Sequence, residues 1–163
     1  LNGFSKVHLM SGWRIGYIAF NQSAKLDALR ENLPKLARVR IATNLPVQHA
    51  ALESLRGPQG YISEFVSELK KRRDLVVKRL NSMPGLSCPN PKGAFYAFPK
   101  IEDNRFGTDK EFVQKLLEKK GVLTVHGSGF GEKYGSGHFR LVYLPSLEIL
   151  DSAMNKIEDF VSQ

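Results

Sequence analysis

The spacing of hydrophobic residues predicts amphipathic helices joined by shorter elements. Leucine and alanine recur at helical spacing over residues 24–40 and again over 46–55. Pro34 falls inside the first of these patterns, so we expect that helix to kink or to split in two. An apolar stripe over residues 62–80 predicts the longest helix, which ends before the breaker pair that starts at Pro84. Its length is typical of a strut that connects two lobes.

Runs rich in β-branched and aromatic residues predict strands in the rest of the chain. These runs cover residues 13–20, 86–88, 94–98, 122–125 and 139–144. Thr108 and Ser146 stand where helix caps are expected, and they predict a helix that runs to Gly121 and a final helix that reaches Phe160. Residues 127–137 are rich in glycine, and we expect a flexible loop there.

After the long helix the sequence pattern changes to short strands and loops, which predicts two parts with a boundary near residue 60. Residues 61–163 indicate an α+β layer, a small sheet with helices. Residues 1–60 are typical of the trailing part of an α/β domain whose main sheet is not in this chain. The chain begins with Leu1 rather than an initiator Met, and we expect a fragment of a longer protein or a processed chain.

Composition narrows the function classes. The formal charge is +8 at pH 7, but basic residues are interleaved with acidic ones, so we expect a solvated basic surface and no nucleic-acid partner. No apolar run approaches bilayer-spanning length, and we expect no membrane association. The single Cys88 excludes an internal disulfide and fits a reducing, cytoplasmic compartment. The 4 histidines lack metal-ligand spacing, so no metal site is expected.

The segment that begins at Ser5 offers the most chemistry. It holds Lys6 in an otherwise uncharged stretch, and Arg14 follows eight residues later between Gly12 and Gly16. A lysine shielded from water near another cation attacks carbonyls more readily, because only the neutral amine forms an imine. An arginine fork suits a phosphate, and the glycines let backbone approach a ligand. Taken alone, however, the pattern favours two surface cations beside a strand.

A family resemblance changes that interpretation. The segment resembles the pyridoxal-phosphate attachment motif of class I and II aminotransferases, in which Ser-Lys is followed by Gly-Trp-Arg-x-Gly-Tyr. The resemblance implies that Lys6 is catalytic and forms the Schiff base with pyridoxal 5'-phosphate. It also implies that Arg14 and Ser5 contact the cofactor phosphate.

Two later segments agree with the resemblance, in the same order along the chain. Residues 90–96 resemble the Pro-x-Gly-Ala-Phe-Tyr turn of the family, and residues 139–141 resemble its Phe-Arg-Leu strand. The resemblance implies that Arg140 binds the substrate α-carboxylate, although an isolated arginine there would be read as a cation at a strand edge. The implied fold is α/β: the end of the large cofactor-binding domain of a fold-type-I transferase over 1–60, then the small C-terminal domain over 61–163.

A finer resemblance is to alanine aminotransferases, through Gly-Ser-Gly-Phe-Gly at 127–131, His-Phe-Arg at 138–140 and Leu-Pro-x-x-Glu at 144–148. Ser146 departs from the proline that is usual in that branch. The implied reaction moves an amino group between alanine and a 2-oxo acid such as 2-oxoglutarate or pyruvate. Alternatives are an aspartate or aromatic aminotransferase, another pyridoxal-phosphate enzyme such as a carbon–sulfur lyase, and the aminotransferase-like sensor domain of a transcription regulator.

The resemblance also implies what this chain lacks. The family's aspartate at the pyridine nitrogen, its stacking aromatic residue and its phosphate-binding turn would all precede Leu1. We therefore expect this chain alone to bind the cofactor poorly and to show little or no activity. The full-length protein is expected to be a homodimer that acts on a small amino acid and a 2-oxo acid.

Overall fold

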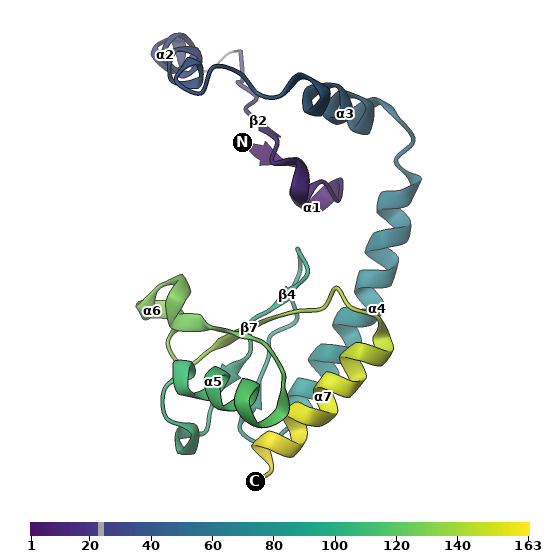
Figure 1. The fold of residues 1–163 in the computed structure, drawn as a ribbon, viewed down its shortest axis with the longest axis vertical. Helices are drawn as coiled ribbons and strands as arrows, with labels where there is room; N and C mark the ends of the chain where they lie inside the picture. The colour runs from purple at the N-terminus through teal and green to yellow at the C-terminus, as the bar shows by residue number, and fades with distance from the viewer. Residues whose placement is uncertain (23–24) are drawn as a thin grey trace. The chain divides into compact units, whose positions relative to one another are not determined.

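The chain divides inside its longest helix, α4 (Gly60–Ser82), whose bounds confirm the predicted long helix. The computed structural model describes residues 1–22 and 25–163, which form two units, Leu1–Glu64 and Phe65–Gln163 (Figure 1). From Phe65 onward α4 belongs to the second unit, where Val76 and Leu80 are fully buried in the core. α4 thus runs from the first unit into the second, as the strut interpretation expects, and its later part is also a core helix of the second unit.

The first unit consists of short elements followed by two helices. They are β1 (Asn2–Gly3), α1 (Phe4–Val7), η1 (Ser11–Trp13, a 3₁₀ turn), β2 (Gly16–Tyr17), α2 (Asp27–Arg38) and α3 (Leu45–Arg56). β1 and β2 pair antiparallel, with Asn2 opposite Tyr17. The strand predicted over 13–20 is therefore present only at Gly16–Tyr17. A strand needs a neighbouring strand to pair with, and within the run only these two described positions pair with one.

The two helices of the first unit follow their sequence signals. α2 is a single helix that contains Pro34, so of the two expected effects of this proline, a kink or a split, the split does not occur. Residue 24, where that helix was predicted to begin, lies outside the described residues. α3 begins at Leu45 with Pro46 in its first turn, where a missing N–H costs no helical hydrogen bond.

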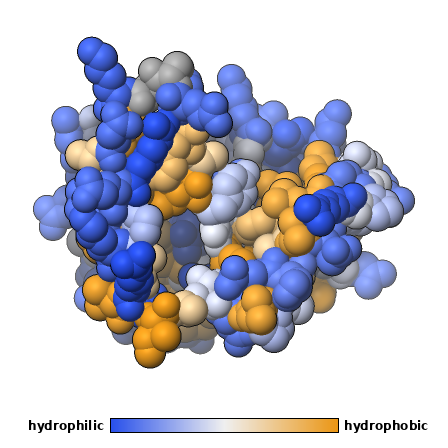
Figure 2. Space-filling model, turned by 90° about the horizontal axis from the view of Figure 1, so that it is seen from above, coloured by the Kyte–Doolittle hydropathy of each residue, from blue (hydrophilic) through white to orange (hydrophobic). Residues whose placement is uncertain are grey.

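The core of the first unit is small. Its buried hydrophobic residues are Phe4, Met10 and Ala51, in the range that the structure describes. α2 buries no residue at all, and Val39 and Ile41 just beyond it are 83% and 91% exposed. Apolar patches are visible among the polar residues in Figure 2. The fold of this unit therefore depends on backbone pairing and a few contacts more than on a large core.

The second unit is a small antiparallel sheet with helices. It contains β3 (Leu86–Ser87), β4 (Tyr96–Ala97), β5 (Lys100–Ile101), η2 (Asn104–Phe106), α5 (Asp109–Lys120), β6 (Val125–His126), η3 (Gly127–Phe130), α6 (Glu132–Gly135), β7 (Phe139–Val142) and α7 (Leu147–Val161). The three-stranded sheet has the order β4-β7-β6, so β7 is central, while β3 pairs with β5. The strands predicted at 86–88, 94–98 and 139–144 are present but shorter, as β3, β4 and β7. Of the strand predicted at 122–125, only Val125 lies in a strand, β6.

Helix caps in the second unit match the sequence signals. Thr108 and Glu111 form a capping box at the start of α5, with the Thr108 N–H donating to the Glu111 carboxylate at 2.7 Å. Gly121 ends α5 in the left-handed region, with φ of 67°. The Ser146 hydroxyl accepts a bond from the N–H of Ile149 at the start of α7. The departure from proline at position 146 thus provides a cap.

The core of the second unit is rich in aromatic rings. Phe112 is fully buried and lies within 5.0–5.4 Å, centroid to centroid, of Phe106, Phe139 and Phe160. α4 and α7 lie side by side (Figure 1), joined by hydrogen bonds from the Arg79 guanidinium to Asp151, Asn155 and Glu158. No helix in the described ranges is long and apolar enough to cross a membrane.

The central position of Phe112 makes it the most informative core residue to truncate. We expect Phe112→Ala to lower the free energy of unfolding by about 3–5 kcal/mol, because it leaves a cavity among three other rings. Gln114→Ala, on the exposed side of the same helix, is the control, with an expected change below about 0.5 kcal/mol. Urea unfolding measures both values, and equal effects of the two substitutions would contradict this assignment of the core.

Candidate active site

A closed loop near the N-terminus carries the first group of candidate residues. The β1–β2 pairing brings residues 3 and 16 opposite each other, and the N–H of Phe4 donates to the Ile15 carbonyl at 3.2 Å. The chain between them therefore forms a loop with fixed ends. Ser5 and Lys6 lie in α1, at the start of this loop, and Arg14 lies near the end of the loop.

The direction of Lys6 follows from the packing of Phe4. Phe4 is 3% exposed, and its carbonyl accepts bonds from the N–H groups of His8 and Met10, at 3.2 and 3.3 Å. Residues two apart on a helix point to nearly opposite sides, so Lys6 faces away from this small core. Lys6 is exposed and Ser5 half-buried. The expected shielding of Lys6 from water is therefore absent from this chain.

Arg14 has a backbone conformation that is uncommon for a residue other than glycine. Its φ and ψ are 53° and 47°, in the left-handed region, directly after η1. Its guanidinium donates to the carbonyl of Ser11 at 3.1 Å, which ties the side chain back to the same turn. The sequence has no Asp or Glu before Asp27. The loop thus presents two cations in a segment without acidic residues.

The loop is further held by contacts that sequence reasoning did not anticipate. His8 Nδ1 lies 2.8 Å from the Tyr61 hydroxyl, and the His8 ring lies 5.1 Å from that of Phe4. The Tyr61 hydroxyl is also 3.5 Å from the Ser54 hydroxyl in α3. These contacts join α1, α3 and the first residues of α4. No spacing in the sequence pairs positions 8 and 61.

The two glycines that frame Arg14 differ in what surrounds them. A Cβ on Gly16 would lie 2.8 Å from the carbonyl oxygen of Asn2, so only glycine fits the β1–β2 pairing there. A Cβ on Gly12 would have no heavy atom of the described residues within 4 Å. At Gly16, therefore, the glycine allows a close approach to the backbone of Asn2 in the same chain.

The second unit contains Arg140, on the central strand β7 rather than at a strand edge. Phe139 and Leu141, on either side of it, are 0% and 6% exposed. Since neighbouring residues of a strand point to opposite faces, Arg140 lies on the face away from the core. Tyr96 lies on the neighbouring strand β4, opposite Val142 of β7, and its side chain shares the face of Arg140.

Two aromatic rings enclose the Arg140 guanidinium. Its Cζ lies 4.1 Å from the ring centroid of Phe130 and 4.7 Å from that of Tyr96. Its Nε is buried without a hydrogen-bond partner, and no carboxylate of the described residues forms an ion pair with it. Cation–π contacts stabilise the guanidinium and leave its edge available for two parallel hydrogen bonds to a carboxylate. Neither aromatic residue had been assigned a role from the sequence.

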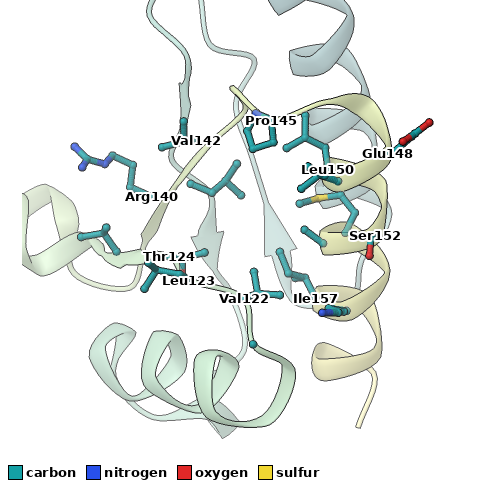
Figure 3. A pocket seen from close by; sticks show the side chains of 17 residues that line it. Val122, Leu123, Thr124, Arg140, Val142, Pro145, Glu148, Leu150, Ser152 and Ile157 are labelled. Carbon is teal, nitrogen blue, oxygen red and sulfur yellow. The ribbon is translucent and has the colours of Figure 1, made fainter. Parts of the chain in front are cut away.

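A cavity of about 620 Å³ lies between the β6–β7 side of the sheet and α7, and its walls are mostly apolar. In Figure 3 the Arg140 side chain extends away from α7, and Glu148 and Ser152 point outward from the helix. Arg140 borders this cavity, but its charged end lies with Phe130 and Tyr96. The cavity is therefore separate from the candidate carboxylate site.

The comparisons with known proteins decide the family. The family described as "Aminotransferase class I and II" matches residues 1–157. The chain belongs to the class I and II aminotransferases. An alanine aminotransferase from Pyrococcus furiosus, a solved structure, superposes with a TM-score of 0.93 at 51% identity, over 98% of this chain and 41% of the other. The fold is therefore that of part of a fold-type-I aminotransferase.

Curated aminotransferases with different substrate names are similar at comparable identity. An aspartate aminotransferase of Pyrococcus horikoshii is 39% identical over 96% of this chain and 39% of its own length. A glutamate-pyruvate aminotransferase of Haemophilus influenzae is 37% identical over 99% of this chain and 41% of its own length. The chain thus spans about two fifths of these relatives.

The structure places Ser5, Lys6 and Arg14 on one loop of the first unit and Arg140 on the sheet of the second. The expected flexible loop at 127–137 instead forms η3 and α6. His138 is packed: its ring stacks on Phe98 at 5.2 Å, and its Nδ1 lies 2.9 Å from the Ser136 carbonyl.

The surroundings of the two loop glycines lead to a direct comparison. Gly16→Ala is expected to lower stability by about 1–3 kcal/mol, because the added methyl would overlap the Asn2 carbonyl. Gly12→Ala, which meets open space, should cost clearly less. Denaturant midpoints of the two variants test this difference. A larger loss for Gly12→Ala would show that the β1–β2 pairing does not hold the loop.

Proposed function

We propose that the complete protein is a pyridoxal-phosphate-dependent aminotransferase in which Lys6 carries the cofactor. The supporting observation is that a family match over residues 1–157 includes a closed loop with an amine at position 6 and a guanidinium at position 14. Ser5 and Arg14 bind the cofactor phosphate in this proposal. Residues 1–60 are the end of the large domain, and 61–163 form the small domain.

The chemistry of the loop fits a phosphorylated aldehyde. The exposed Lys6 amine can reach a carbonyl outside this unit, while a guanidinium and a hydroxyl are suitable donors to phosphate oxygens. The absence of acidic residues before Asp27 leaves the segment attractive to a dianion. The left-handed conformation of Arg14, which costs about 1–3 kcal/mol, is typical of a residue held for function.

The residues of the chain then have distinct tasks. When bound, the cofactor supplies the electron sink for the carbanion at the substrate α-carbon. Lys6 Nζ, as a neutral amine, removes the proton from the α-carbon as a general base, and the resulting ammonium gives the proton back as a general acid. Arg14 and Ser5 hold the phosphate end, which fixes the distance between Lys6 and the reacting atoms.

Arg140 orients the substrate in this proposal. Its guanidinium, held between Phe130 and Tyr96, donates two parallel hydrogen bonds to the substrate α-carboxylate. Holding the carboxylate restricts rotation of the amino acid and thereby limits the directions that its α-proton can take.

We propose alanine as the amino donor and a 2-oxo acid such as 2-oxoglutarate as the acceptor. The support is the 51% identity to the Pyrococcus furiosus alanine aminotransferase and the 37% identity to the glutamate-pyruvate enzyme. Aspartate or aromatic transamination is the second candidate, because relatives with those names are 39% and 36% identical. Rates with alanine, aspartate and phenylalanine, each with 2-oxoglutarate, separate these possibilities. We further propose a cytoplasmic homodimer.

The assignment of Lys6 has a chemical test. Borohydride reduction of the complete protein with pyridoxal phosphate should attach the cofactor to the peptide that contains Lys6. Lys6→Arg should lower kcat by at least about 10²–10⁴-fold, because it removes the proton-transferring amine but retains the charge. Lys25→Arg is the control and should keep wild-type activity. Labelling of another lysine, or of none, would overturn the proposed function.

The assignment of Arg140 is tested by a substitution that keeps its charge. Arg140→Lys should lower kcat/KM by about 10- to 100-fold, as expected when a hydrogen bond between charged groups is lost. Arg105→Lys is a matched control in the same unit. Arg105 also lies over an aromatic ring, with its Cζ 4.8 Å from the ring centroid of Phe106. Steady-state kinetics should show the loss only at position 140.

A further inference from the structure

The ring of Phe130 contacts Arg140 although more than half of it is exposed. Phe130 is 51% exposed and ends η3, and its other ring contact is with Phe98 at 6.1 Å. Side-chain packing alone therefore restrains this ring weakly. What fixes its position is the backbone of the turn that carries it.

That turn is packed against its neighbours at backbone distance. A Cβ on Gly127 would lie 2.2 Å from the Gly135 carbonyl oxygen, and a Cβ on Gly135 would lie 2.0 Å from that of Gly127. The N–H of Gly127 also donates to the His138 carbonyl at 2.8 Å. The start of η3 is thus fixed against α6 and the strand that leads to Arg140.

The middle of the turn is held by a buried carboxylate. Asp109, at the start of α5, is 5% exposed, and its Oδ2 accepts a bond from the N–H of Ser128 at 2.7 Å. The side chain of Ser128 also hydrogen-bonds to this carboxylate. Burial by itself would raise the pKa of Asp109, but these hydrogen bonds, with the nearby His126, hold it below its usual value. Asp109 is therefore a charged acceptor at neutral pH.

His126 completes the arrangement. Its Nδ1 lies 3.0 Å from the Ser128 hydroxyl, accepts a bond from the N–H of Gly129 at 3.2 Å and is 3.9 Å from Asp109 Oδ2. Two successive N–H groups of the turn are thus bound by side chains, and Phe130 is the next residue. No such bond from Asp109 or His126 reaches Arg140 itself.

We propose that Asp109 is a positioning residue for substrate binding, which keeps the η3 turn in place and with it the Phe130 ring over the guanidinium of Arg140. This inference rests on the proposed role of Arg140 in binding the substrate carboxylate. Asp109 touches no reacting atom and acts through Ser128 and Phe130. Its loss frees the turn, so the guanidinium loses one of its two aromatic neighbours and its orientation.

Kinetics of the complete protein test this role. Asp109→Ala should raise KM for the amino acid about 2- to 30-fold, the range that loss of one cation–π contact produces, with little change in kcat. Asp109→Asn keeps an oxygen that can accept from Ser128, and it should restore most of the affinity. Phe130→Leu should raise KM similarly, and adding Asp109→Ala to it should have little further effect, because both act on the same contact.

Thr108→Ala is the matched control. It removes the capping box of α5, one residue from Asp109, without touching η3. Both substitutions should lower stability, but Thr108→Ala should leave KM unchanged. An unchanged KM in Asp109→Ala, when Arg140→Lys raises it, would overturn the positioning role and leave the proposed function intact. If Arg140→Lys has no effect on KM, the proposed role of Arg140 fails instead.

A second measurement does not depend on activity. The Nε–H of Arg140 lies beside two rings, so its NMR signal carries a ring-current shift, and Arg140→Lys identifies that signal by its loss. Asp109→Ala should move this signal, Asp109→Asn should largely restore it, and Thr108→Ala should leave it in place. A signal that does not move in Asp109→Ala contradicts the inference, whatever the enzyme catalyses.

Discussion

The alternation of side chains along β7 is the constraint on which the second unit depends. β7 is the central strand, and Phe139 and Leu141 are buried in the core. Because neighbouring side chains of a strand point to opposite faces, Arg140 must lie on the other face of the sheet. A shift of one residue in the pairing would bury the guanidinium and expose both hydrophobic residues, at a large cost in free energy. The same packing that stabilises the unit therefore places the Arg140 side chain on the face of the sheet away from the core.

The surroundings of Arg140 depend on tertiary contacts of a different kind. Phe130 comes from a turn that has little apolar burial of its own and is ordered by backbone contact at Gly127 and Gly135 and by the Asp109 carboxylate. A buried carboxylate is expensive unless hydrogen bonds satisfy it, so the Ser128 bonds stabilise the turn and the carboxylate together. The Asp109 carboxylate therefore links the stability of the turn to the surroundings of Arg140 in the inference above.

In the first unit, the charged residues Lys6 and Arg14 are held by backbone pairing and a few side-chain contacts rather than by a large core. Its core is small, and the β1–β2 pairing, the Phe4 carbonyl and the His8–Tyr61 contact hold the loop of Lys6 and Arg14. A lysine on the outer side of such a loop is accessible rather than shielded. The chain spans about two fifths of its relatives, and in the proposed enzyme the remaining protein would supply the environment that makes this amine reactive.

The sequence by itself determined the long helices α4, α5 and α7, the caps at Thr108 and Ser146, the end at Gly121 and the family motif around Lys6, because these features depend on residues close together in the chain. It could not determine that only two residues of the 13–20 run form a strand, that Pro34 remains inside a single helix, or that the glycine-rich segment is ordered. The first and the last of these outcomes depend on partners distant in sequence, at β1 and at Asp109. Only the tertiary structure showed that Phe130 and Tyr96 enclose Arg140 and that Asp109, from a separate helix, accepts a hydrogen bond from the turn that carries Phe130. Hydrogen bonds and ring contacts across the fold leave no periodic trace in the chain.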